Sequence, residues 1–205
     1  MEIPAIYSVF KGGEVMSAPV RFDGARISFE SEPERLAYSA DEEGDRGQVL
    51  VVDVRGLGRR WMDERLLTNA RFPGSDVWFL THVRDVGDVF DCFIGGAARL
   101  LLPYHTARRG RVMREAYELS ENCVPVVFVS RGRALCGGGR TADVGAAVEE
   151  LAGIGYREVA ALDTDSSLGE GDWAHLRDRL PGLIPFVRSR GSVAAGGFKD
   201  VIADF

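Results

Sequence analysis

Two aspartates and two histidines lie where acid–base chemistry could take place. Asp53 and Asp163 each end a short apolar run, and His82 and His105 stand at the ends of two further runs. A carboxylate and an imidazole with an ordinary pKa near neutrality form a pair that can transfer a proton. We therefore predict Asp53, Asp163, His82 and His105 as catalytic residues.

Arginines occur at the same kind of position. A guanidinium group binds phosphate or carboxylate with two parallel hydrogen bonds, so several of them indicate an anionic ligand. Arg188 and Arg190 alternate along one strand end, so only one of the two is expected to face the site. The predicted substrate-binding residues are Arg55, Arg131, Arg188, Arg190, Tyr7 and Ser130.

These residues also have structural interpretations. Asp53 and Asp163 can each bond the backbone of the loop that follows them, and a histidine at a strand end is more often a structural residue than a catalyst. A metal site made of His82, His105 and Asp53 has suitable residue types, but the spacings carry no metal-binding signature. We expect no metal and no cofactor.

The elements that must position these residues alternate regularly. Mostly apolar runs, typical of strands buried on both faces, lie at 3–9, 48–54, 76–82, 99–104, 124–130, 157–163 and 183–188. Helical patterns lie between most of them, at 32–43, 62–70, 85–95, 108–120, 141–155 and 171–180. Strand followed by helix, repeated along the chain, predicts a parallel α/β sheet, either open and doubly wound or closed into a barrel. No GxGxxG follows the first strand, which removes one reason to favour the open sheet.

Both ends of the chain depart from a regular pattern. Residues 13–30 contain two short extended patterns separated by Asp23-Gly24, which predicts a hairpin after the first strand. After the seventh strand, residues 189–198 are too short and too rich in small residues for a full helix. The segment 200–205 is expected to be an eighth strand. The alternative is a tail that leaves a gap, whose open edges a second copy of the chain would cover.

The chain also repeats itself weakly. Residues 3–13 are similar to 124–134, and residues 44–58 are similar to 153–169, so that each half contains a strand, a glycine-rich excursion and a later strand that ends in aspartate. Such a pattern is typical of a duplicated half-barrel.

Five segments resemble the histidine-biosynthesis barrel family, whose members are phosphoribosylformimino aminoimidazole carboxamide ribotide isomerase and the cyclase subunit of imidazole glycerol phosphate synthase. These segments are 3–15, 32–57, 77–89, 155–176 and 184–193. The resemblance implies a (β/α)8 TIM barrel with two similar halves, here shortened at the C-terminus. We expect one such domain over residues 1–205.

The family's catalytic positions have changed. Tyr7 and Val129 stand where the isomerase has its two catalytic aspartates, and Leu162 stands where it has a threonine. The family's phosphate-binding glycines of the third unit correspond to Leu80, Thr81 and His82, and those of the fourth unit correspond to Pro103 and Tyr104. Proline has no N–H to offer a phosphate. In the seventh unit Gly191 is kept while its partner glycine is Arg190. The resemblance therefore implies the fold without the isomerase reaction.

Bulk composition limits the partners. The 205 residues include three cysteines, with no CxxC, and the net charge of −6 argues against nonspecific nucleic-acid binding. No run of eighteen apolar residues and no basic N-terminal region is present, so we expect a cytoplasmic protein away from membranes. Lysine occurs only at 11 and 199, and asparagine and glutamine total three, which fits a thermophile, although a GC-rich genome also favours arginine.

Two functions follow from these observations. One is a divergent isomerase-like enzyme, an isomerase or lyase, that acts on a small phosphorylated or anionic metabolite at the C-terminal face of the barrel. The other is a barrel without catalysis that acts as a binding subunit or scaffold.

Overall fold

The chain folds around a closed barrel of eight parallel strands. The computed structural model describes residues 1–36, 47–70, 72, 74–106, 111–188, 193 and 197–204. In order around the barrel the strands are β1 (Glu2–Lys11), β6 (Gln48–Asp53), β7 (Asp76–Leu80), β8 (Arg99–Pro103), β9 (Cys123–Ser130), β12 (Val159–Asp163), β13 (Leu183–Val187) and β14 (Val201–Asp204). The predicted TIM barrel is thus confirmed as a closed parallel barrel.

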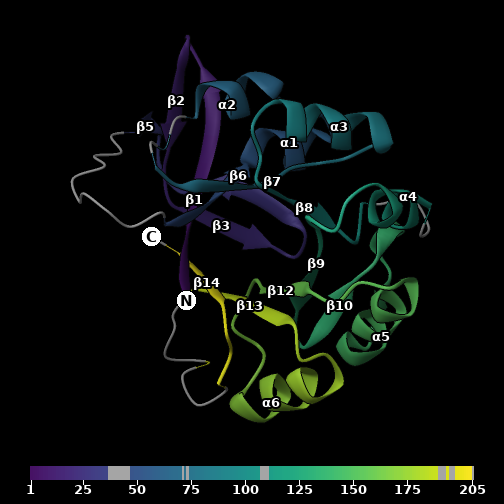
Figure 1. Cartoon of the computed structure of the whole chain (residues 1–205). Coiled ribbons are helices and arrows are strands. Elements are labelled where there is room, and N and C mark those ends of the chain that lie inside the picture. The colour runs from purple at the N-terminus through teal and green to yellow at the C-terminus, as the bar shows by residue number, and fades with distance from the viewer. Residues whose placement is uncertain are drawn as a thin grey trace.

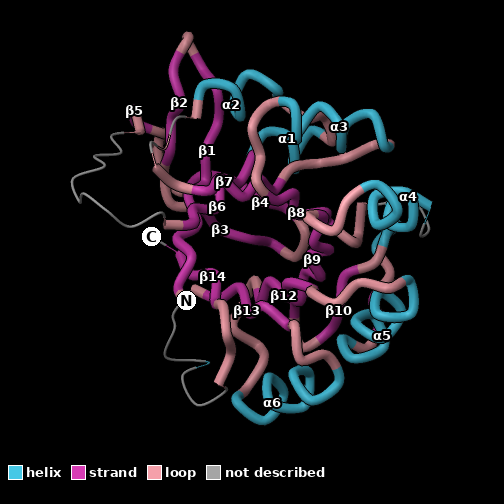
Figure 2. The backbone as a smooth tube through the Cα atoms, viewed as in Figure 1, coloured by secondary structure: helices cyan, strands magenta, loops and turns pink. Residues whose placement is uncertain are grey.

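The described part of the chain contains six α-helices. They lie outside the strands, as Figure 2 shows in cyan. They are α1 (Val54–Arg59), α2 (Glu64–Asn69), α3 (Val86–Ile94), α4 (Arg111–Leu119), α5 (Val144–Ile154) and α6 (Glu170–Arg179). Five of the six predicted helical segments contain a helix. The prediction over 32–43 is wrong at its start, because β5 (Glu34–Arg35) pairs there with β2 (Glu14–Ser17), and residues 37–43 lie outside the described part of the chain. No described helix is long and apolar enough to cross a membrane.

The C-terminal strand closes the barrel. β14 pairs in parallel with β1, from Glu2 opposite Val201 to Ala5 opposite Asp204, and with β13 on its other side. The first and the last strand of the chain therefore lie side by side (Figure 1). The alternative of a gap between β13 and β1 is therefore wrong, and the open edges that suggested a covering second copy do not arise. Most of residues 189–198 lie outside the described residues, so the absence of a seventh helix stays a prediction.

Every barrel strand divides its side chains between two apolar layers. Leu50 and Val52 of β6 point into the barrel with Trp78 and Leu80 of β7, while their sequence neighbours pack under the surrounding helices. Because both faces are buried, the strands show continuous apolar runs in the sequence.

A stacked ion pair lies at the N-terminal end of the barrel strands. The Arg99 guanidinium lies 4.7 Å from the centre of the Trp78 ring and forms an ion pair with Glu158. The guanidinium therefore stacks on an aromatic face while its charge is neutralised. These contacts leave the opposite, C-terminal end as the place for a functional site, as in other barrels of this class.

Two barrel strands continue beyond the barrel as hairpins. β1 turns back into β2 through Gly12 and Gly13, and β9 turns back into β10 (Arg133–Leu135) through Arg131 and Gly132. All four turn residues have positive φ angles, as a tight two-residue hairpin requires. β10 then pairs with β11 (Thr141–Ala142). The same type of hairpin therefore extends β1 and β9, the two strands that the predicted internal repeat relates.

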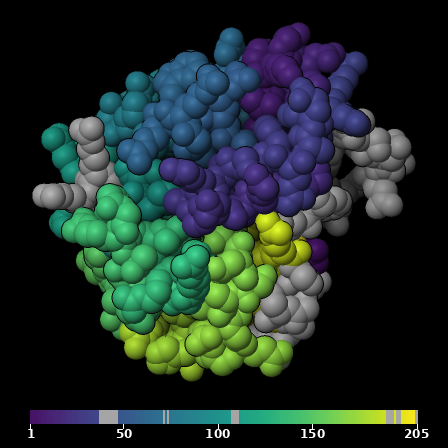
Figure 3. Space-filling model, turned by 180° about the vertical axis from the view of Figure 1, so that it is seen from behind, coloured from purple at the N-terminus to yellow at the C-terminus, as the bar shows by residue number. Residues whose placement is uncertain are grey.

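The predicted hairpin after the first strand is present and covers the mouth of the barrel. β3 (Val20–Asp23) and β4 (Arg26–Phe29) are connected by the turn Gly24–Ala25, where Gly24 has a φ of 58°. Figure 3 shows the hairpin, in dark violet-blue, crossing one face of the molecule between its two halves.

One face of this hairpin is apolar and packs on the interior of the barrel. Val20 and Ile27 belong to the interior cluster, and Phe22 and Phe29 pack against it. The Phe22 ring makes edge contacts with Tyr7 and with Phe128. The alternate residues, Arg21, Asp23, Arg26 and Ser28, are exposed. The hairpin therefore covers the centre of the mouth.

The closure of the barrel by β14 yields a stability prediction. Ile202 is fully buried in the barrel interior, so Ile202→Ala should lower the free energy of unfolding by about 3 kcal/mol through lost burial and a cavity. Urea unfolding measures the change. The control is Lys199→Ala, since this side chain is exposed and should change stability by less than about 0.5 kcal/mol. If Ile202→Ala is as stable as the control, the last strand does not close the barrel.

Candidate functional site

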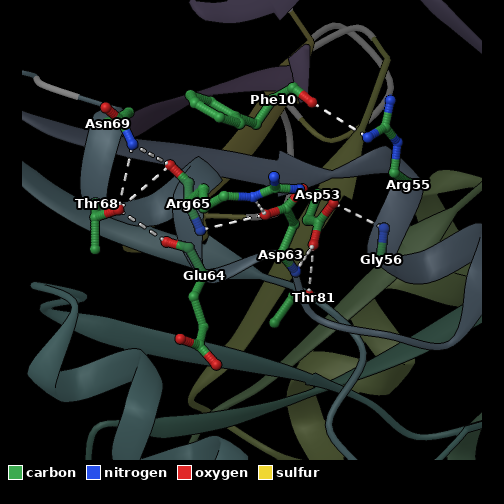
Figure 4. Close-up of polar contacts among 10 residues, drawn as sticks. All are labelled: Phe10, Asp53, Arg55, Gly56, Asp63, Glu64, Arg65, Thr68, Asn69 and Thr81. Carbon is green, nitrogen blue, oxygen red and sulfur yellow. Dashed lines mark hydrogen bonds and ion pairs between the residues drawn. The ribbon is translucent and has the colours of Figure 1, made fainter. Parts of the chain in front are cut away.

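Asp53, at the end of β6, is fully buried and its carboxylate is saturated with hydrogen bonds. Its Oδ1 accepts from the Gly56 N–H at 2.7 Å, and its Oδ2 accepts from the Asp63 N–H at 3.2 Å and from the Thr81 hydroxyl at 2.9 Å. Figure 4 shows these bonds converging on the carboxylate. Burial raises the pKa of Asp53 above its ordinary value, although the three hydrogen bonds act in the other direction.

These contacts fix the loop that contains α1. Gly56 is required here, because a Cβ atom would collide with the Asp53 carboxylate and the Thr81 hydroxyl. Asp63 continues the network by pairing with Arg65 through both carboxylate oxygens, at 2.9 and 3.0 Å. The geometry favours the structural interpretation of Asp53, since all its bonds go to groups that shape the mouth of the barrel.

Asp163 has a matching place and matching contacts. Its Oδ1 accepts from the N–H and hydroxyl of Ser167 at 3.0 and 3.1 Å, and its Oδ2 accepts from the Leu168 N–H at 2.9 Å. Both aspartates at the ends of β6 and β12 thus bind the backbone of the next loop. Their catalytic role stays a prediction without geometric support.

The loops after β9 and β12 are joined by Asp165. Its Oδ2 accepts from the Ser130 hydroxyl at 3.1 Å and from the Arg131 N–H at 2.8 Å. Burial would raise the pKa of Asp165, but these bonds and one from Ser167 outweigh it and the pKa is lowered. Ser130 and the backbone of Arg131 therefore hold two loops together.

The other predicted ligand-binding residues also have partners within the protein. Arg55 Nη1 donates to the carbonyl oxygen of Phe10, and Arg188 Nη2 donates to that of Val20, each at 3.2 Å. Tyr7 is buried under the hairpin against Phe22. Arg190 lies outside the described residues. The structure thus does not gather these residues at one site, and their role in binding a ligand stays a prediction.

A cavity of about 980 Å³ opens beside the hairpin. Its walls are the edge of β3–β4, the C-terminal end of α1, and the segment after β8. Three arginines line it, with a single carboxylate among its described residues, and the rest of the wall combines apolar side chains with Ser28, His105 and Thr106. The charged lining is Arg21, Arg26, Arg60 and Asp23, and the apolar lining includes Phe22, Ile27 and Leu57.

His105 is the one predicted catalytic residue that lines this cavity. Its ring packs edge-on against Phe128, with the ring centres 4.5 Å apart, and its Nδ1 is shielded from solvent with no hydrogen-bond partner among the described residues. Burial, with the positive charge of Arg60 as a second cause, lowers the pKa of His105 to about 4. The imidazole is therefore neutral at pH 7.

His82 lies near His105 but is buried away from the cavity lining. Burial and the charge of Arg60 lower its pKa as well, while Asp88 acts in the other direction. Its Nδ1 also has no partner among the described residues. The two histidines thus share one positive neighbour. The described residues contain no group of three side chains that could hold a metal ion, and the Asp53 oxygens are already occupied.

Arg60 is the residue that the sequence pattern did not identify. It follows α1 directly, and its backbone is left-handed, with a φ of 57° and a ψ of 43°. No hydrogen bond or ion pair joins its side chain to another described residue. Glycine is the usual residue at such a helix end because other residues are strained there. One sequence signal could have identified Arg60. It follows "GLGR" (56–59), at the position where the short helix ends and where glycine is the usual residue.

Comparison with known proteins supports the fold alone. No family model matches the chain, and no curated protein matches it either. Among solved structures, the carboxyl transferase domain of Rhizobium etli pyruvate carboxylase is similar, with a TM-score of 0.54 and 14% identity over 77% of this chain and 33% of that one.

The same domain solved with oxamate and biotin has a TM-score of 0.55 at 13% identity, over the same shares of the two chains. This chain therefore spans about a third of the length of those relatives. The similarity assigns the chain to the TIM-barrel class. No particular family is identified, and the resemblance to the histidine-biosynthesis barrels stays a prediction.

The backbone of Arg60 yields a prediction about stability. Arg60→Gly should raise the free energy of unfolding by about 0.5–1 kcal/mol, because glycine adopts the left-handed conformation without strain. The matched control is Arg59→Gly, inside the same helix, which should lower stability by about 1 kcal/mol. Urea unfolding of both variants measures this. Equal destabilisation by the two glycines would show that Arg60 is unstrained.

The pKa of His105 predicts how stability depends on pH. In the unfolded chain His105 binds a proton near pH 6.5, whereas in the folded chain it does so only near pH 4. As pH falls from 6.5 toward 4, protonation therefore favours the unfolded chain, and the free energy of unfolding decreases. Between pH 7 and pH 5 the free energy of unfolding of the original protein should fall by about 1 kcal/mol more than that of His105→Asn. This value allows for the partial exposure of His105 to solvent. Urea unfolding at both pH values gives the two losses, and identical losses would contradict the lowered pKa.

Proposed function

We propose that the protein binds a small anionic or phosphorylated metabolite in the cavity beside the β3–β4 hairpin. The observation that carries this proposal is Arg60, which is unpaired among the described residues and held in a strained backbone conformation at the cavity. Strain of this kind persists where surrounding structure maintains it, and it is concentrated at functional sites. An exposed arginine whose side chain has no hydrogen bond or ion pair among the described residues keeps its donors available for a ligand.

The charge of the cavity supports an anion. Arg21, Arg26 and Arg60 face a single Asp23 among the described lining residues, in a protein whose net charge is −6. A local excess of positive charge in an acidic protein raises the concentration of anions at that point. His105 is neutral at pH 7 and offers one ring N–H as a further donor.

Binding is better supported than catalysis. Asp53 and Asp163, the carboxylates predicted as acid or base, use their oxygens on loop backbone. His105, with a pKa of about 4, is a weak base near neutral pH. The binding-subunit alternative therefore agrees better with the described site than an isomerase or lyase does.

Inorganic phosphate and Arg60 provide the test. Phosphate should raise the melting temperature of the protein by mass action, and Arg60→Gln should weaken its binding about tenfold, since a hydrogen bond between charged groups contributes about 1.5–3 kcal/mol. Isothermal titration calorimetry gives both affinities.

The control for charge is Arg59→Gln. This residue is the immediate neighbour of Arg60 and does not line the cavity, so its loss should leave phosphate affinity within about twofold of the original value. An equal effect of the two substitutions would mean that phosphate responds to overall charge, and no binding at all would reject the anion site.

A further inference from the structure

The cavity is much larger than a phosphate ion needs. Its volume of about 980 Å³ is at the upper end of the range for pockets that hold small organic ligands, about 300–1,000 Å³. The charged groups account for only part of its lining. The remaining lining residues therefore indicate which chemical groups the ligand has besides its anionic group.

Part of that wall is apolar. Phe22 and Leu57 are both only partly buried, although each packs against the interior cluster of the barrel. They lie on two different elements, the hairpin and α1. Arg21 stands on the hairpin, and Arg60 directly follows α1. Each element therefore brings an apolar side chain and a cation to the same cavity.

The aromatic side chains behind this wall are fixed by mutual contacts. Phe22 contacts Tyr7 at 6.1 Å and Phe128 at 6.4 Å between ring centres, and Phe128 contacts His105 at 4.5 Å, all edge to face. Rings held in this way form a rigid surface that loses little conformational freedom when a ligand covers it. His105 ends the row at the cavity with a neutral imidazole.

We propose that the ligand is an amphipathic anion, with a planar apolar group that lies against Phe22 and Leu57 and an anionic group bound by Arg60. This inference rests on the proposed anion site and adds the class of ligand. A sugar phosphate of the same charge would leave Leu57 and the Phe22 ring facing polar groups. The apolar wall thus selects between anions, while the arginines bind all of them.

Phenyl phosphate and glycerol 3-phosphate test this selection. They carry the same anionic group on an apolar ring and on a polar chain, respectively. Phenyl phosphate should bind about tenfold more tightly, because burial of the ring against an apolar wall adds to the shared contribution of the phosphate. Calorimetry with the full chain gives both dissociation constants, with inorganic phosphate as the reference.

Leu57→Ala should reduce the preference for phenyl phosphate about threefold and leave the affinity for inorganic phosphate unchanged. Leu119→Ala is the matched control, since Leu119 is a partly buried leucine at the end of α4, outside the cavity, and the preference should stay at its original value. Melting temperatures of both variants confirm that they are folded.

The possible outcomes separate the two proposals. Equal affinity of the original protein for phenyl phosphate and glycerol 3-phosphate, with Arg60→Gln weakening both, would overturn the amphipathic ligand and leave the anion site standing. Failure of every phosphate compound to bind would overturn both. A tenfold preference that falls in Leu57→Ala and not in Leu119→Ala supports the proposed ligand class.

Discussion

The pairing of β14 with both β13 and β1 is the constraint on which the rest of the structure depends. A sheet of eight parallel strands has two unpaired edges unless it closes, and its interior side chains are buried only when the circle is complete. Closure is achieved here with a four-residue last strand, which pairs with the backbone of both its neighbours.

The hairpin β3–β4 then decides where a ligand can bind. In many barrels the active site lies over the central axis, within loops that follow the strands. Here Val20, Phe22 and Ile27 cover that position and extend the interior cluster out of the barrel. The open space is displaced to the side, between the hairpin, α1 and the segment after β8.

Polar groups at the mouth of the barrel fall into two classes. Asp53, Asp163 and Asp165 give their carboxylate oxygens to loop backbone and hydroxyl groups, so they maintain the shape of the mouth. Arg60 and His105 lack such partners among the described residues and line the cavity. The three carboxylates are thus committed to the scaffold, whereas Arg60 and His105 keep donors that a ligand in the cavity can use.

The sequence by itself determined the elements: apolar runs predicted the barrel strands, helical periodicity predicted five of the six helical segments, and Asp23-Gly24 predicted the hairpin. These features depend on local periodicity and turn chemistry, which neighbouring residues specify. The helix expected at 32–43 was wrong at its start because Glu34 and Arg35 pair with β2, a contact between separate segments. The strand ends indicated His105, which lines the cavity, but they did not indicate Arg60, which stands at the end of a short helix.

Only the tertiary structure decided how these elements meet. It placed β14 beside β1, turned the hairpin over the mouth, bonded Asp53 to Gly56, Asp63 and Thr81, and brought Arg60 near two histidines. Each of these outcomes depends on packing and hydrogen bonding between residues remote in sequence or in separate loops. Whether a carboxylate is used by the scaffold or left for a ligand depends on which donors the folded chain brings within hydrogen-bonding distance of it.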